Sequence, residues 1–200
     1  MAAASHRSRS EDRMLVMNAG RNWILCLCDG AGGMSGGANA ADLLVHRVQR
    51  VSSATAFDVN SPEVWSTLLA ESDAEIRQAP KAGETTGIVM ALTPTTIIGA
   101  SCGDSEAWLF SEHAHRELTC DQVRKPRLGT GLAQPRSFHA AARGTLVIAS
   151  DGLFSYVKPD DVAREVFRDP GLTAVALRRV LEFHYRVLPD DVAIIVAHTE

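Results

Sequence analysis

The sequence predicts an α+β fold, a four-layer α-β-β-α sandwich in which two central, mainly antiparallel sheets are flanked by helix pairs. Two observations predict this class. Apolar patterns follow one another in the order strand, helix pair, strand meander, helix pair, strand. The last strand, VAIIVA at residues 192–197, is apolar on both faces, so both of its faces must be covered.

Residues 1–200 are predicted to form a single domain, because this length suits one hydrophobic core better than two. Hydrophobic residues (46%) and charged residues (22%) have the shares of an ordinary globular protein. The net charge of −4, without a long stripe of Lys and Arg, gives little support to nucleic-acid binding. A phosphorylated protein remains an open partner.

The first predicted elements are a β-hairpin and two helices. The runs MLVM and WILCLC, within residues 13–29, are separated by a turn signal at residues 18–20. Apolar residues then recur at helical spacing in two stretches, namely Ala41, Leu44, Val45 and Val48, and then Trp65, Leu68, Leu69 and Ile76.

The next elements are a strand meander and a second helix pair. GIVMAL, TIIGAS and EAWLF predict three strands, and a weaker strand is expected at residues 117–119. Residues 121–134 lack periodicity and are rich in Arg, Lys, Pro and Gly, so we expect a surface connection there. The strand LVIAS follows, and then one helix beginning at Pro159 and another around Leu177, Val180 and Leu181.

No apolar run reaches the length of a signal-peptide core or a membrane span, so we expect a cytoplasmic protein that does not bind membranes. A monomer is the default because no heptad repeat is present. Neither the cysteines nor the seven histidines show zinc-ligand spacing. We expect buried, reduced thiols at Cys26, Cys28, Cys102 and Cys120.

Aspartates stand where four predicted strands meet turns, at Asp29, Asp104, Asp151 and Asp190. A single Asp-Gly pair is usually only a turn signal, but four such positions can converge on one edge of a sandwich. Clustered carboxylates repel one another unless a hard divalent cation such as Mg²⁺ or Mn²⁺ binds them. The pattern therefore predicts a metal site. The alternative, a phosphate-binding loop at DGAGGMSGG, lacks the Lys and Ser/Thr of a Walker motif.

Five blocks of the sequence resemble, in order, the motifs of the metal-dependent serine/threonine protein phosphatases of type 2C. The likeness runs along nearly the whole chain. The blocks are RSRSED at residues 7–12, DGAGG at 29–33, GETT at 83–86, GDS at 103–105, and SDGLF at 150–154 together with PDDV at 189–192.

The resemblance implies a role for each matching residue. It implies that Asp29 bridges two Mn²⁺ or Mg²⁺ ions, that the Gly30 carbonyl binds one ion, and that Asp151 and Asp190 hold the other. Glu11 and Asp12 would act through metal-bound waters, and Asp104 with Asp151 would hold a third, weaker ion. Arg7 would grip the substrate phosphate. A water bridged between the two ions would then hydrolyse phosphoserine or phosphothreonine directly.

The sequence also departs from the family pattern. Ala31 stands where many members have a His that protonates the leaving group, and Asp191 replaces an Asn. The flap region, residues 120–135, is much shorter than the flap that borders the active site in longer relatives.

Two alternatives to a protein phosphatase therefore stay open. One is a regulatory or binding module of phosphatase fold that has weak or no catalysis. The other is a two-metal phosphoesterase that acts on nucleotides or small phosphates. As a signalling phosphatase, the chain would act on the product of a serine/threonine kinase.

Overall fold

A computed structural model describes residues 2–4, 10–31, 36–54, 57–112, 114–169, 171, 173–185, 188 and 190–199 of the chain. Two five-stranded antiparallel sheets form its centre. The first has the strand order β10-β7-β6-β3-β2 and contains β2 (Arg13–Ala19), β3 (Asn22–Cys28), β6 (Gly87–Leu92), β7 (Thr96–Cys102) and β10 (Arg136–Ala141).

The second sheet has the order β1-β12-β11-β8-β9. Its strands are β1 (Ala2–Ala4), β8 (Glu106–Ser111), β9 (Ala114–Glu117), β11 (Gly144–Ala149) and β12 (Val192–Thr199). A short two-stranded pair, β4 (Gly30–Ala31) with β5 (Glu84–Thr85), extends from the end of the first sheet.

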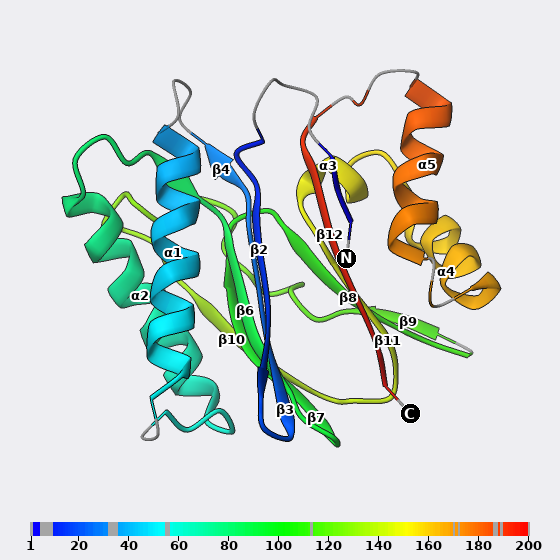
Figure 1. The fold of residues 1–200 in the computed structure, drawn as a ribbon, viewed down its shortest axis with the longest axis horizontal. Helices are drawn as coiled ribbons and strands as arrows, with labels where there is room; N and C mark the ends of the chain where they lie inside the picture. The colour runs from blue at the N-terminus through cyan, green and yellow to red at the C-terminus, as the bar shows by residue number, and fades with distance from the viewer. Residues whose placement is uncertain are drawn as a thin grey trace.

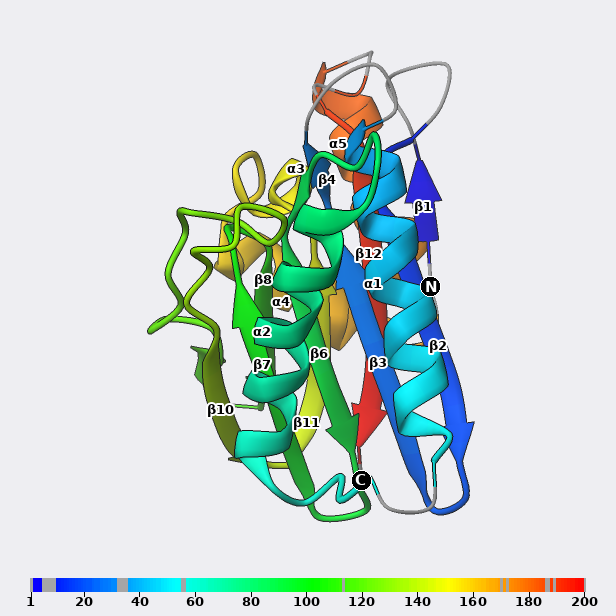
Figure 2. The same ribbon diagram turned by 90° about the vertical axis from the view of Figure 1, so that its left-hand side faces the viewer.

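Helices cover the outer face of each sheet. The helices α1 (Gly36–Ser52) and α2 (Pro62–Gln78) lie on the first sheet, and Figure 2 shows them in front of it. On the second sheet lie α3 (Asp151–Phe154), α4 (Pro159–Arg168) and α5 (Thr173–Tyr185). The resulting order of helices, sheet, sheet and helices is visible in Figure 1 and is consistent with the predicted four-layer sandwich.

Alternating side chains of the strands divide the interior into three cores. In β3, Leu25 and Leu27 point between the two sheets, whereas Ile24 and Cys26 pack under α1 and α2. In β12, Ile195 lies in the core between the sheets and Ile194 in the core under α3, α4 and α5. The prediction that the last strand is covered on both faces is therefore confirmed.

The structure differs from the sequence predictions in several connecting regions. The strand β10 and the short helix α3 were not predicted, and the weak strand expected at residues 117–119 lies earlier, as β9. Residues 121–134 do not form a purely surface connection, because Leu128 is fully buried. Cys26, Cys28 and Cys102 are buried free thiols as predicted, but Cys120 is exposed.

Among the described residues, no helix combines the length and the apolar character that crossing a bilayer requires.

Candidate active site

Carboxylates from distant parts of the sequence gather at one edge of the two sheets, where strands begin or end. Burial raises the pKa of Asp29, and the charges of Asp12 and Asp151 raise it further. Burial likewise raises the pKa of Asp151, with additional contributions from Asp104 and Asp190. The structure thus brings together the aspartates that the sequence singled out.

Two close backbone contacts account for the Asp-Gly pairs at this edge. A Cβ atom at Gly30 would lie 2.4 Å from the carbonyl oxygen of Gly37, at the start of α1. A Cβ at Gly152 would lie 2.1 Å from the carbonyl oxygen of Asp191. Glycine is therefore required after Asp29 and Asp151, because another backbone segment approaches too closely for a side chain.

Hydrogen bonds from two threonines hold the backbone of Asp29. The N–H of Asp29 donates to Thr86 Oγ1 at 3.0 Å, and the N–H of Thr86 donates to the Asp29 carbonyl at 2.8 Å. Thr85 Oγ1 donates to the same carbonyl at 3.1 Å. The GETT motif therefore fixes the position of Asp29, which leaves its side chain available for a ligand.

The Asp12 carboxyl group is buried without a hydrogen-bond partner, since neither of its oxygens has one in the described structure. Burial raises its pKa to about 7, the nearby Ser150 hydroxyl lowers it in part, and the charge of Asp191 adds to the rise. The pKa of Asp29 reaches about 9. Without a cation, Asp29 favours its protonated form at neutral pH, and Asp12 is protonated in part.

This donor set fits a divalent cation in its chemistry. Several carboxylates, with two oxygens of Asp12 that have no hydrogen-bond partner among the described residues, make a hard, oxygen-rich environment. Among the described residues, however, no three His, Cys, Asp or Glu side chains already stand in the geometry of a metal site. Binding of a cation would therefore draw the carboxylates closer together.

The sequence analysis missed Arg127, which the structure places against this acidic edge. Its guanidinium group donates to both oxygens of Asp104, with Nη2 at 2.7 Å from Oδ2 and 2.9 Å from Oδ1, and Nε at 3.2 Å from Oδ1. Its charge also lowers the pKa of Asp29 and Asp151. No sequence motif connects Arg127 with Asp104, so only the fold shows the pair.

The remaining predicted residues differ in how well they are placed. Arg7 lies outside the described residues. Gly30 is buried in β4, directly after Asp29. Glu11 is buried, and its N–H donates to Asp191 Oδ2 at 3.0 Å. Asp191 in turn donates its own N–H to Asp190 Oδ1 at 2.8 Å. The hydrogen bond between Glu11 and Asp191 therefore connects the chain before β2 to the chain before β12.

A polar hollow of about 190 Å³ lies between β9, β10 and the start of the flap region. Arg116, Arg136 and His139 contribute to its lining. Gln122 also lines it and donates from Nε2 to the carbonyl of Ser105, the residue after the paired aspartate, at 2.8 Å. The hollow therefore combines two arginines with one carboxylate, that of Asp121.

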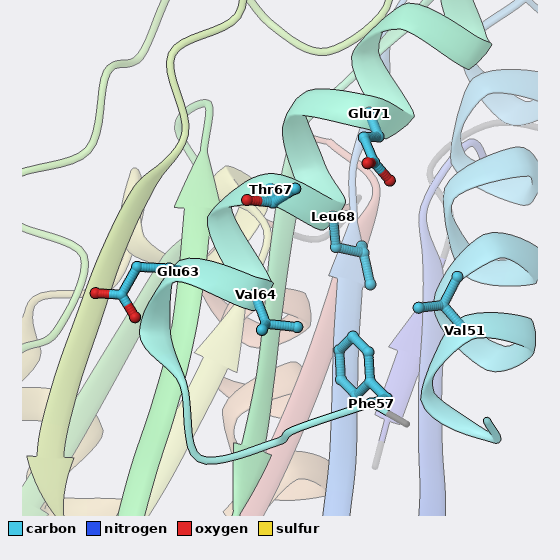
Figure 3. A pocket seen from close by; sticks show the side chains of 7 residues that line it. All are labelled: Val51, Phe57, Glu63, Val64, Thr67, Leu68 and Glu71. Carbon is cyan, nitrogen blue, oxygen red and sulfur yellow. The ribbon is translucent and has the colours of Figure 1, made fainter. Parts of the chain in front are cut away.

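A second groove, of about 260 Å³, lies where α1 ends and α2 begins (Figure 3). Its lining is mostly apolar, and its two charged groups are glutamates, which would repel a phosphate. The groove therefore lacks the groups of an active site. It is lined by Val51, Phe57, Glu63, Val64, Thr67, Leu68 and Glu71.

Comparison with known proteins identifies the fold. No protein-family model and no curated protein sequence matches the chain. Solved structures do: a bacterial serine phosphatase matches 100% of this chain and 96% of its own, with a TM-score of 0.86 and 18% identity. The serine/threonine phosphatase Stp1 from Staphylococcus aureus matches 100% and 93%, with a TM-score of 0.84 and 19% identity.

The catalytic domain of the serine/threonine protein phosphatase PstP, solved in complex with two manganese ions, also matches. The match covers 100% of this chain and 96% of that domain, with a TM-score of 0.75 and 20% identity. The chain therefore has the fold of these bacterial phosphatases, as the sequence motifs predicted.

Proposed function

We propose that the protein is a metal-dependent phosphatase that hydrolyses phosphoserine and phosphothreonine in proteins, using two divalent cations. The observation that carries the proposal is the group of carboxylates formed by the buried Asp12 and the partly buried Asp29 and Asp151. Their pKa values are raised, and neither oxygen of Asp12 has a hydrogen-bond partner among the described residues. Such an arrangement costs stability unless a cation occupies it, so it is typical of a functional site.

Each of the chain's own residues would have a separate role at such a site. Asp29, whose backbone the two threonines hold, would bridge the ions, and Asp151 and Asp190 would complete the ligands of one of them. The Gly30 carbonyl would bind the other ion, while Asp12 and Glu11 would orient waters. When bound, the ions supply an activated water and neutralise the phosphate charge during in-line displacement.

Substrate recognition would use the positive groups around the acidic edge. Arg7 remains our proposed phosphate ligand, because a guanidinium group presents a fork of donors to phosphate oxygens. The hollow lined by Arg116, Arg136 and His139 suits an anionic segment of a substrate protein. We propose that this substrate is the product of a serine/threonine kinase.

A third, weaker ion would need the carboxylate of Asp104 together with that of Asp151. Both oxygens of Asp104 already accept hydrogen bonds from Arg127. A third ion and the guanidinium group therefore compete for the same atoms.

The direct test is phosphate release from a phosphothreonine peptide with Mn²⁺, with EDTA, and by the variant Asp151→Asn, with folding checked by circular dichroism. We expect release only from the wild-type protein with Mn²⁺. If the folded protein binds Mn²⁺ but releases no phosphate, the regulatory-module alternative is correct. If nucleotides are hydrolysed faster than phosphopeptides, the protein is a phosphoesterase of small substrates.

A further inference from the structure

Among the described residues, Arg127 is the cationic side chain that contacts the acidic edge most closely, through Asp104. Its side chain is 19% exposed and that of Asp104 is 18% exposed, so the pair is largely withdrawn from solvent. The two groups meet through three N–H to oxygen contacts, which is the bidentate geometry that a guanidinium group forms with a carboxylate. Removing one partner of such a pair is costly, because it leaves an uncompensated charge in a largely buried place.

The backbone next to Arg127 is held in place from two sides. Leu128 is fully buried, and its N–H and carbonyl form hydrogen bonds with Thr85 at 3.1 and 3.0 Å. Thr85 also contacts the carbonyl of Asp29. The guanidinium group therefore starts from a backbone that is fixed relative to Asp29.

The chain that follows is fixed by the buried side chain of Asp73, in α2. One of its oxygens accepts the N–H groups of Gly129 and Gly131 at 2.7 and 2.9 Å, and the other accepts that of Ala133 at 3.1 Å. The short flap region is thus tied down along its length. No loop has to be ordered for Arg127 to reach Asp104.

We propose that the Arg127 guanidinium group is a built-in cation at Asp104 that takes the place of the third metal ion. A tethered cation competes with a dissolved ion at an effective concentration of about millimolar or more, without losing freedom of translation. A weak third ion would have to displace it and leave it without a partner in a largely buried place. The inference rests on the proposed two-ion site and predicts that the chain binds two ions.

The test is the number of Mn²⁺ ions bound per chain, measured by isothermal titration calorimetry and by the electron paramagnetic resonance signal of free Mn²⁺. We expect two ions for the wild-type protein and three for Arg127→Gln. The double variant Arg127→Gln, Asp104→Asn should bind two again. Arg124→Gln is the matched control, because Arg124 is 67% exposed and pairs with Glu106 instead. It removes the same charge and should leave two ions.

Two results would overturn the inference while leaving the two-ion site intact. One is a third ion in the wild-type protein that is lost in Asp104→Asn, and the other is two ions in a folded Arg127→Gln. If Arg127→Gln does not fold, Asp104→Asn alone decides: an unchanged count of two supports the inference, and a fall from three to two overturns it. Absence of any Mn²⁺ binding to the wild-type protein would overturn the two-ion site as well.

Discussion

Two buried aspartates, Asp73 and Asp12, show how the same side chain serves different purposes in this molecule. Asp73 is 4% exposed, and its two oxygens accept three backbone N–H groups of the flap region. Asp12 is 8% exposed, yet neither of its oxygens has a hydrogen-bond partner in the part of the chain that the structure describes, and its pKa rises to about 7. A carboxylate that the fold itself satisfies stabilises the fold, whereas one that it leaves unsatisfied indicates a ligand.

The largest expected effect concerns Asp29, whose pKa the charge of Asp12 raises at the same acidic edge. Asp29→Asn should lower Mn²⁺-dependent phosphatase activity by at least about 100-fold, since even residues behind metal ligands cost 10–100-fold when mutated. The metal-free variant should melt no lower than the wild-type protein, because asparagine leaves no charge to bury. Asp42→Asn, which changes a carboxylate that pairs with Arg13 on the surface, should keep full activity. A strongly destabilised Asp29→Asn would contradict the comparison.

The second prediction concerns Asp73, the carboxylate whose oxygens accept hydrogen bonds from the flap region. Asp73→Asn replaces a charged acceptor by an amide, so one of the three flap N–H groups would face a donor. We expect a loss of about 2–3 kcal/mol in the free energy of unfolding, which lowers the melting temperature by roughly 4–12 °C in a chain of this length. Glu71→Gln on the same helix is the control and should shift the melting temperature only slightly, because the Glu71 carboxylate is 60% exposed and Arg47 keeps its second partner, Glu75.

The stability of the metal-free protein should depend on pH through the two carboxyl groups of the acidic edge whose pKa values are raised most. Asp12 and Asp29 have pKa values of about 7 and 9 in the folded state, against 3.8 as the ordinary value. The folded state therefore holds protons that the unfolded chain releases, and stability present below about pH 4 is lost as the pH rises through 7 and 9. We expect the melting temperature in EDTA to fall by roughly 5 °C or more between pH 5 and pH 9.

Saturating Mn²⁺ should remove this dependence, because a bound cation keeps the carboxylates ionised in the folded state. Differential scanning calorimetry at several pH values measures the melting temperature in both conditions, with EDTA and with Mn²⁺. A flat EDTA profile would mean that the acidic edge is better solvated than the structure indicates.

The smallest expected effect concerns Asp191, which stands where the related phosphatases usually have Asn. Its Oδ2 accepts the N–H of Glu11, and the oxygen of an asparagine can accept the same bond. Asp191→Asn should therefore change activity by less than about threefold, because the hydrogen bond is kept. It should also raise the stability of the metal-free protein at pH 8 slightly, since the charge of Asp191 raises the pKa of Asp12. Asp190→Asn, its neighbour, should be far more harmful.

Much of the fold and most of the candidate site could be predicted because their signals are local. The Asp-Gly pairs at residues 29–30 and 151–152 mark the ends of apolar strands, and the apolar run VAIIVA indicates burial on both faces. The edge strand β10 carries only two buried side chains, Phe138 and Ala140, so its apolar signal is weak. It was therefore not predicted.

Pairing between distant residues left no sequence signal. Arg127 meets Asp104 across 23 positions, and Asp73 binds backbone groups that every residue possesses. The basic composition of residues 121–134 indicated solvent exposure, and the fold instead uses one of these arginines against the acidic edge. Such contacts depend on three-dimensional proximity, which spacing and composition do not encode.

The separation of the interior into three cores has a consequence for how such a sequence diverges. Each core is filled by its own set of side chains, and neighbouring cores are divided by a sheet whose backbone remains in place. Substitutions in one core can therefore compensate one another without disturbing the other two. A lineage could in this way exchange most of its apolar residues over time and still present the same aspartates at the same edge.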